Sequence, residues 1–139
     1  MSGPSAGFSG LKVVAFESRH PGAAHALIRA RGGQALVVPA DPGGRFPEDP
    51  LPLRAAVREL AAGRADAALF TSPLQVTHAV RMAVREELWS GFRRSFGRTL
   101  LGAAGRATAR ELGEFGLEPD VTASGLAPLI RRAAASAGP

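Results

Sequence analysis

The sequence predicts an α/β domain in which helices cover both faces of a five-stranded parallel sheet with the flavodoxin-like strand order. Short apolar runs alternate with segments of helical periodicity from residue 11 to the end of the chain. Two of these runs, within residues 68–76 and 101–109, stop at small hydroxyl or glycine residues and turn directly into helical sequence. Parallel sheets build sites for anionic ligands with such strand-to-helix turns.

The first part of the chain contains a strand, a helix and a second strand. Residues 1–10 are rich in Gly, Ser and Pro, and we expect them to be a disordered tail. Residues 11–16 form an apolar, β-branched run that predicts a buried strand, with 17–20 as its exit loop. Pro21 suits the first position of a helix that Gly32 and Gly33 end, and residues 35–38 predict the second strand.

A proline-rich connection follows, over residues 39–52. Five prolines and two glycines in this stretch exclude a continuing helix or a central strand. The connection therefore either folds back on its own chain or crosses to a second copy, in which case residues 11–38 would be exchanged between the subunits of a homodimer.

The second part of the chain repeats the alternation of helix and strand. Helical periodicity predicts helices over residues 53–62, 73–84, 106–115 and 126–135, and a further helical stretch over 86–96 that carries Trp89, Phe92 and Phe96. These aromatic residues are expected in the core or in a subunit interface. The remaining strands are predicted at residues 66–70, 98–103 and 118–122.

Length and composition indicate one domain, residues 11–139, in a chain of 139 residues with a formal net charge of +5. The positive charge comes almost entirely from arginines spread along several helices, so we expect no nucleic-acid partner. With no cysteine, a thiolate metal site and a cysteine nucleophile are excluded. The sequence shows no membrane span and no signal-peptide pattern, and we expect a cytoplasmic protein.

Ligands of parallel sheets bind outside the carboxyl ends of the strands. In this sequence those ends carry short polar segments, at residues 18–20, 40–41, 71–72, 105–106 and 123–125. Each has a simpler explanation: Thr71 and Ser72 are favoured residues for capping the next helix, and Gly102 and Gly105 suit close packing of helix on strand. A nicotinamide site is disfavoured because the dinucleotide fingerprint is incomplete, and no nucleophile-elbow sequence supports a serine triad.

The pattern resembles the uroporphyrinogen-III synthase family of tetrapyrrole biosynthesis. The resemblance rests on residues 12–19 (KVVAFESR), the Phe70-Thr71-Ser72 strand exit and the turn at residues 102–109. It continues through residues 111–120 (ELGEFGLEPD) and 124–129. Family members have two α/β domains with the substrate cleft between them. This chain resembles the discontinuous domain alone, with the connection at 39–52 where the other domain would be inserted.

The resemblance implies a lyase that closes hydroxymethylbilane, a linear tetrapyrrole with eight carboxylates, into a macrocycle with one ring inverted. Such a protein mainly positions its substrate, and no metal or organic cofactor is implied. The chain has no tyrosine to assist loss of the substrate hydroxyl, and no catalytic residue is assigned. The resemblance assigns the anionic substrate to residues at the strand exits: Ser18, Arg19, Thr71, Ser72, Gly105, Arg106 and Thr108.

Three functions therefore remain open. The first is a synthase of this family, in a reduced form or as a dimer that rebuilds the cleft. The second is a non-catalytic tetrapyrrole-binding or regulatory module that keeps the fold without the chemistry. The third is an isolated domain.

Overall fold

A computed structural model describes residues 7–39 and 44–137 of the protein. Five parallel strands form one sheet in the order β2-β1-β3-β4-β5. Their bounds are Lys12–Phe16 (β1), Gln34–Val38 (β2), Ala67–Phe70 (β3), Leu100–Ala104 (β4) and Val121–Ala123 (β5). The predicted flavodoxin-like order is thereby confirmed.

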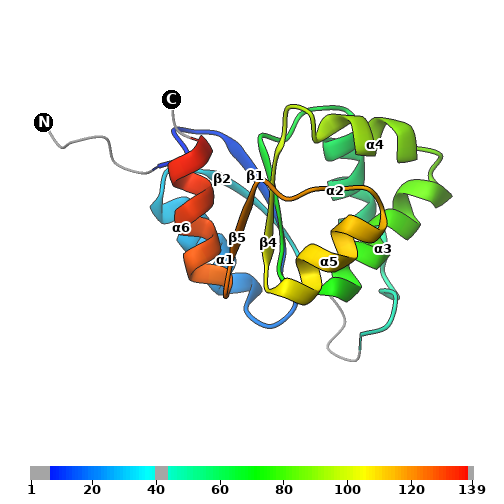
Figure 1. Ribbon diagram of the computed structural model, residues 1–139, viewed down its shortest axis with the longest axis horizontal. Helices are drawn as coiled ribbons and strands as arrows, with labels where there is room; N and C mark the ends of the chain where they lie inside the picture. Colours follow the sequence, from blue (N-terminus) through cyan, green and yellow to red (C-terminus); the bar gives the residue numbers. More distant parts are fainter. Residues whose placement is uncertain (1–6, 40–43, 138–139) are drawn as a thin grey trace, which may run out of the picture.

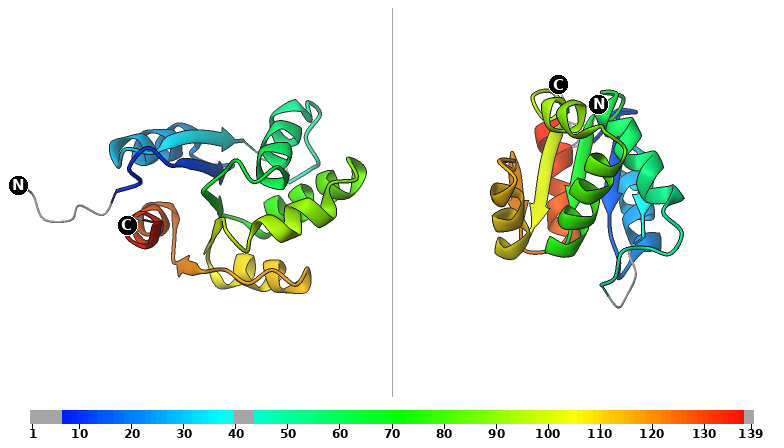
Figure 2. Two further views of the ribbon diagram at one scale, coloured as in Figure 1. Left: turned by 90° about the horizontal axis from the view of Figure 1, so that it is seen from above. Right: turned by 90° about the vertical axis from the view of Figure 1, so that its right-hand side faces the viewer.

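Helices cover both faces of the sheet (Figures 1 and 2). On one face lie α1 (Pro21–Ala30) and α6 (Leu126–Ala137); on the other lie α2 (Leu51–Ala61), α3 (Pro73–Arg85), α4 (Trp89–Ser95) and α5 (Arg106–Glu114). The alternation of side chains along β1 explains the two cores: Val13 and Ala15 pack under α1 and α6, whereas Val14 and Phe16 pack under the other helices. Because both faces are covered, the strands are mainly apolar; their polar residues are Lys12, Gln34 and Thr122, at the start of β1, the start of β2 and in β5.

The N-terminal segment is packed from residue 7 onward. Phe8 is fully buried, and its backbone N–H donates to the carbonyl of Arg31 at 2.7 Å. Gly33 makes room for this packing, since a Cβ there would lie 2.8 Å from Ile28 and 3.0 Å from Phe8. The predicted disordered tail thus extends over residues that the structure places in the fold; residues 1–6 lie outside the described ranges.

The helical stretch predicted at residues 86–96 is separated from α3 by a sharp turn. Glu87 adopts a left-handed backbone conformation, with φ of 58°, and the N–H of Leu88 donates to the carbonyl of Ala83 at 2.7 Å. The turn redirects the chain so that Phe92 is fully buried against Trp89, with 6.0 Å between their ring centroids. The aromatic residues of this stretch therefore belong to the core of the chain itself.

Two aspartates fix neighbouring strands to each other at the amino-terminal edge of the sheet. The carboxylate of Asp66 accepts the N–H of Lys12 at 2.8 Å, and the N–H of Asp66 donates to the carbonyl of Lys12 at 2.8 Å. The carboxylate of Asp120 accepts the N–H of Leu101 at 2.8 Å, while its own N–H donates to the carbonyl of Leu101 at 2.7 Å. Asp66 precedes β3 and bonds to the beginning of β1, and Asp120 precedes β5 and bonds to the beginning of β4. Each aspartate thus joins the start of its own strand to the start of the strand beside it in the sheet.

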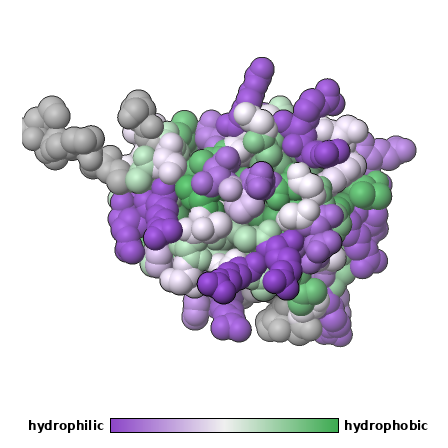
Figure 3. Space-filling view, in the orientation of Figure 1, coloured by the Kyte–Doolittle hydropathy of each residue, from purple (hydrophilic) through white to green (hydrophobic). Residues whose placement is uncertain are grey.

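Polar side chains cover most of the face shown in Figure 3, with smaller apolar areas between them. Within residues 7–39 and 44–137, none of the helices has the length and apolar character that crossing a membrane requires.

Candidate functional site

The three central strands bring the predicted site segments to one edge of the sheet. Phe16, at the end of β1, pairs in register with Phe70 of β3, and Phe70 pairs with Ala103 of β4. The exits of β1, β3 and β4 are therefore neighbours, and α1, α3 and α5 begin at this edge. The backbone N–H groups and dipoles of helix N-termini favour anions. Of the other predicted exits, residues 40–41 lie outside the described ranges.

Thr71 and Ser72, at the exit of β3, both have structural partners. The Thr71 hydroxyl donates to the carbonyl of Phe16 at 2.8 Å, so it ties β3 to β1. The Ser72 hydroxyl is the N-cap of α3 and accepts the N–H of Gln75 at 3.4 Å. The capping role that the sequence suggested is thus confirmed for Ser72. Because Ser72 is also partly exposed, it can still meet a ligand at the surface.

The exit of β4 places a glycine and an arginine at the start of α5. Gly105 is the N-cap, with φ of 89° and ψ of 153°, a conformation that side chains other than hydrogen disfavour. Arg106 follows and is exposed at the rim. Thr108, in contrast, is only 2% exposed and lies inside the fold. Of this group, Gly105 and Arg106 can meet a ligand at the surface.

The exit of β1 presents basic and acidic groups together. Ser18 is half-buried and the Arg19 side chain is exposed. Glu17, which precedes them, is only 5% exposed; its carboxylate accepts the N–H of Arg19 at 3.2 Å and lies 3.2 Å from the Thr71 hydroxyl. The sequence predicted no more than a loop at Glu17. An acidic residue directly after a buried strand was the signal that could have found it.

Gln75 is a second residue that the sequence reasoning missed. It is 3% exposed, and its side-chain oxygen lies 3.3 Å from the N–H of Thr71 and 3.2 Å from the Thr71 hydroxyl. Its side-chain nitrogen is buried, and no group within the described residues accepts a hydrogen bond from it. The S-x-x-Q pattern of residues 72–75 is the sequence signal, because a glutamine at this helical position commonly reaches back to the helix start.

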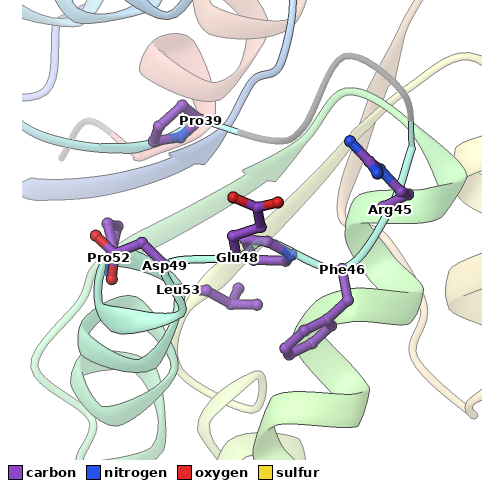
Figure 4. A pocket seen from close by; sticks show the side chains of 8 residues that line it. Pro39, Arg45, Phe46, Glu48, Asp49, Pro52 and Leu53 are labelled. Carbon is purple, nitrogen blue, oxygen red and sulfur yellow. The ribbon is translucent and has the colours of Figure 1, made fainter.

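Two adjoining hollows lie beside this edge, under the segment that connects β2 to α2. The larger, of about 430 Å³, is lined by Pro39, Leu53 and residues of the connection that include Arg45 and Glu48 (Figure 4). The smaller is a recess of about 10 Å³ that shares Pro39, Pro47 and Leu53 with it. The remaining residues of the recess are Phe16, Val38, Gln75 and His78.

The described part of the connection folds back on its own chain and is held by Phe46. The Phe46 ring meets His78 edge-on, with 5.5 Å between ring centroids. The Arg81 guanidinium lies 4.4 Å from the centre of the same ring, and that of Arg85 lies 5.4 Å from it. Arg81 and Arg85 of α3 therefore contact the Phe46 ring of the connection.

The arrangement is suited to binding and orienting an anionic ligand. Its accessible groups are the guanidinium groups of Arg19 and Arg106, the Ser72 hydroxyl and the N-termini of α3 and α5. Within the described ranges, no three His, Asp or Glu side chains gather as a metal site would require. The geometry therefore offers positioning by hydrogen bonds and charge.

Comparison with known proteins points to one family. The sequence model of the family described as uroporphyrinogen-III synthase HemD matches residues 45–128, which is more than half of the chain. Among curated proteins, none matches the chain significantly.

Solved structures of a thermophilic bacterial enzyme share the fold. Wild-type uroporphyrinogen III synthase from Thermus thermophilus is 23% identical, with a TM-score of 0.56 over 91% of this chain and 49% of its own. A mutant form of the enzyme from the same bacterium is 20% identical, with a TM-score of 0.54 over 90% of this chain and 50% of its own. The chain thus spans about half the length of the synthase chains that it resembles.

Proposed function

The chain belongs to the uroporphyrinogen-III synthase family, and we propose that it binds hydroxymethylbilane at the carboxyl edge of its sheet and closes it with inversion of one ring. The observation that carries this proposal is the convergence of three strand exits and two helix N-termini, at α3 and α5, on one edge. Eight carboxylates on the substrate would match the arginines and backbone N–H groups found there. No cofactor is part of the proposal, and we expect the protein to act in the cytoplasm.

The proposed reaction asks the protein mainly for positioning. Loss of the terminal hydroxyl of hydroxymethylbilane as water leaves a cationic azafulvene, and a spiro intermediate then allows one pyrrole to invert before the ring closes. Arg19 and Arg106 would hold carboxylate arms, while Ser18, Ser72 and Gly105 would contribute hydroxyl and backbone groups at the same edge. The half-buried Thr71 and the buried Thr108 would support this edge from within, since both lie under the surface groups.

A non-catalytic tetrapyrrole-binding module is the second candidate. It is supported by the convergence of the strand exits and helix N-termini on one edge, since such a module needs the binding edge only. The two candidates make the same prediction for binding and opposite predictions for the product.

The deciding experiment incubates the purified protein with hydroxymethylbilane, oxidises the products and separates the porphyrin isomers. The spontaneous reaction without protein gives the non-inverted isomer and serves as the control. An excess of the inverted isomer is expected for the synthase. Protein-bound substrate with only the non-inverted isomer would identify the binding module, and absence of both binding and inversion would refute both candidates.

A further inference from the structure

Glu17 is a buried carboxyl group at the carboxyl edge that the proposed function leaves unused. It directly follows β1 and is only 5% exposed. Because Phe16 pairs in register with Phe70, the next residues, Glu17 and Thr71, are neighbours on adjacent strands. The strand order turns back between β1 and β3, and ligands of such sheets bind at this switch point. Glu17 therefore lies where a ligand of this fold is expected.

The two oxygens of the Glu17 carboxylate have different surroundings. Oε1 accepts the backbone N–H of Arg19 at 3.2 Å and lies 3.2 Å from the Thr71 hydroxyl. Oε2 has no hydrogen-bond partner within residues 7–39 and 44–137, and it is not one of the fully buried atoms that lack a partner there. Oε2 therefore reaches the surface. One oxygen anchors the side chain, and the other is open to a ligand.

The charge of Glu17 is not balanced by a cationic side chain. Glu59 is paired with Lys12 and Arg64, and Glu86 is paired with arginines of α2. In the part of the chain that the structure describes, no Lys or Arg side chain forms such a pair with Glu17. The negative charge of its carboxylate is therefore available to a cation of the ligand.

The proposed reaction needs a proton donor and then a negative charge at the same place. Loss of the hydroxyl as water requires a proton on the leaving oxygen, and the azafulvene that remains is cationic. Arginines at the edge do not give up a proton, and they repel a cation. Among the described residues at the exits of β1, β3 and β4, Glu17 is the only carboxyl group, and the chain has no tyrosine.

We propose that Glu17 is the general acid for loss of the substrate hydroxyl. The proposal rests on the proposed function, because it takes a hydroxymethyl-bearing tetrapyrrole as the ligand. The protonated carboxyl group transfers its proton to the hydroxyl oxygen, the C–O bond breaks, and its electron pair leaves with the water molecule. The pyrrole ring supplies the electron pair of the new exocyclic C=C bond, so the positive charge resides on the ring.

The same carboxyl group completes the cycle of the proton. After the transfer, Glu17 is a carboxylate beside the azafulvene cation, and in a site shielded from water this attraction is strong. When a pyrrole carbon then bonds to the azafulvene, that carbon loses its proton and the carboxylate takes it up. Glu17 thus ends in the protonated form with which the reaction began.

His20 is the competing proton donor at this edge. It is the N-cap residue of α1, and its side chain is exposed. An imidazolium that has given up its proton is neutral, whereas the Glu17 carboxyl group becomes negative. Only Glu17 therefore stabilises the cation that its proton transfer creates, and the two residues are tested side by side.

The test uses a pyrrole that carries one hydroxymethyl group, one carboxymethyl arm and one carboxyethyl arm. In water labelled with ¹⁸O, mass spectrometry follows exchange of the hydroxyl oxygen in the presence of the full chain. A single pyrrole cannot form a macrocycle, so exchange reports the breaking of the C–O bond alone. We expect the wild type to accelerate exchange over the reaction in buffer.

Glu17→Gln separates proton transfer from structure, because glutamine keeps the length and an oxygen for the N–H of Arg19. We expect the protein-dependent exchange to fall about a hundredfold or more, as for loss of a general acid. The affinity for the pyrrole, measured by NMR titration, should stay near that of the wild type. Glu59→Gln is the matched control, because Glu59 is also a partly buried carboxylate but bonds to Lys12 and Arg64 at the opposite edge. His20→Gln should likewise exchange as the wild type does.

Each result decides for or against Glu17. The proposal is overturned if the wild type does not accelerate exchange, if Glu17→Gln exchanges like Glu59→Gln, or if His20→Gln is the variant that loses exchange. If Glu17→Gln does not fold, the ¹³C signal of the Glu17 carboxyl group in the wild type decides, and it must shift when the pyrrole is added.

The outcome for Glu17 is distinct from the outcome for the synthase. Exchange that depends on Glu17, without formation of the inverted isomer from hydroxymethylbilane, would leave the general acid standing and refute the synthase. Formation of the inverted isomer at an unchanged rate by Glu17→Gln would do the reverse.

Discussion

Substitution of Gly105 by alanine should destabilise the protein through backbone strain alone. Its φ of 89° and ψ of 153° lie in a region that is essentially limited to glycine. A Cβ at this position would meet no atom within 4 Å, so steric overlap does not contribute. Residues held in such conformations cost about 1–3 kcal/mol each, and the free energy of unfolding should fall by that amount.

The expected change in melting temperature follows from the length of the chain. At about 2.1 cal/mol/K per residue, unfolding of 139 residues has an entropy of about 0.3 kcal/mol/K. The Gly105→Ala variant should therefore melt about 3–10 °C below the wild type in a thermal scan followed by circular dichroism.

Gly113→Ala is the matched control in the same helix. Gly113 has no positive φ and no atom within 4 Å of a built Cβ. Alanine in a helix is about 0.5–1 kcal/mol more favourable than glycine, so this variant should melt a few degrees higher. The two substitutions are chemically identical and should act with opposite signs. If Gly105→Ala melts at or above the wild type, the reasoning from the conformation of Gly105 is refuted.

Four further predictions concern packing, charge, the rim and assembly. Gly102→Ala should lower the free energy of unfolding by about 1–3 kcal/mol, because a Cβ at this position would lie 2.7 Å from Leu69. The urea midpoint should fall accordingly, and an unchanged midpoint would contradict this prediction. Hydrogen bonds from Lys12 and Arg64 lower the pKa of the Glu59 carboxyl group. The Glu59 carboxylate therefore stabilises the fold at pH values above its ordinary pKa, and this stabilisation is lost as the pH falls through its lowered pKa in the folded protein. The stability difference between the wild type and Glu59→Gln, about 1 kcal/mol or less for a surface network, should therefore shrink in urea titrations from pH 7 to acid, and a constant difference would argue against this coupling. The double variant Arg19→Gln/Arg106→Gln should bind an octacarboxylate porphyrin severalfold more weakly in fluorescence titrations at low salt. Unchanged affinity would exclude the carboxyl edge of the sheet as the anion site. The described part of the connection folds back on its own chain, so light scattering should give a monomer, whereas a dimer would support exchange of residues 11–38.

The sheet could be predicted from the sequence because its strands are short, apolar and buried on both faces. The runs at residues 67–70 and 100–104 carry no competing helical pattern, and the glycines and prolines at their ends mark the turns. The order of the strands then follows from right-handed crossovers and from the usual topologies of alternating strand and helix. Prediction worked where local pattern and global fold agree.

The sequence separated two helical stretches near residue 85, but the turn at residues 86–88 could not be predicted in this way. Residues 86–88 continue the helical periodicity, and neither glycine nor proline marks the left-handed turn at Glu87. Burial of Phe92 by tertiary packing decides the path of the chain there. Local sequence carries no signal for such a contact.

The sequence identified which segments meet at the carboxyl edge of the sheet, and identified less well which of their residues reach the surface. The strand exits identify the edge, but the orientation of α5 decides that Thr108 points inward, and hydrogen bonding to β1 occupies Thr71. The connection also contributes Pro39 and Pro47 to the recess at Gln75, and its Phe46 packs against His78 of α3. Contacts of a proline-rich connection with a distant helix are long-range, and periodicity does not describe them.

The aspartates at the amino-terminal edge have a consequence for how faithfully the sheet assembles. If β1 slipped by one residue against β3, or β4 against β5, the aspartate carboxylate and the backbone N–H that it accepts would both lose their hydrogen-bond partner. Every side chain of the slipped strand would also face the wrong side of the sheet. Asp66 and Asp120 therefore help to fix the register of these strand pairs. The fixed register matters most for β5, because its three residues form few backbone hydrogen bonds with β4. As a short edge strand, β5 also leaves few unpaired backbone groups with which a strand of another molecule could pair.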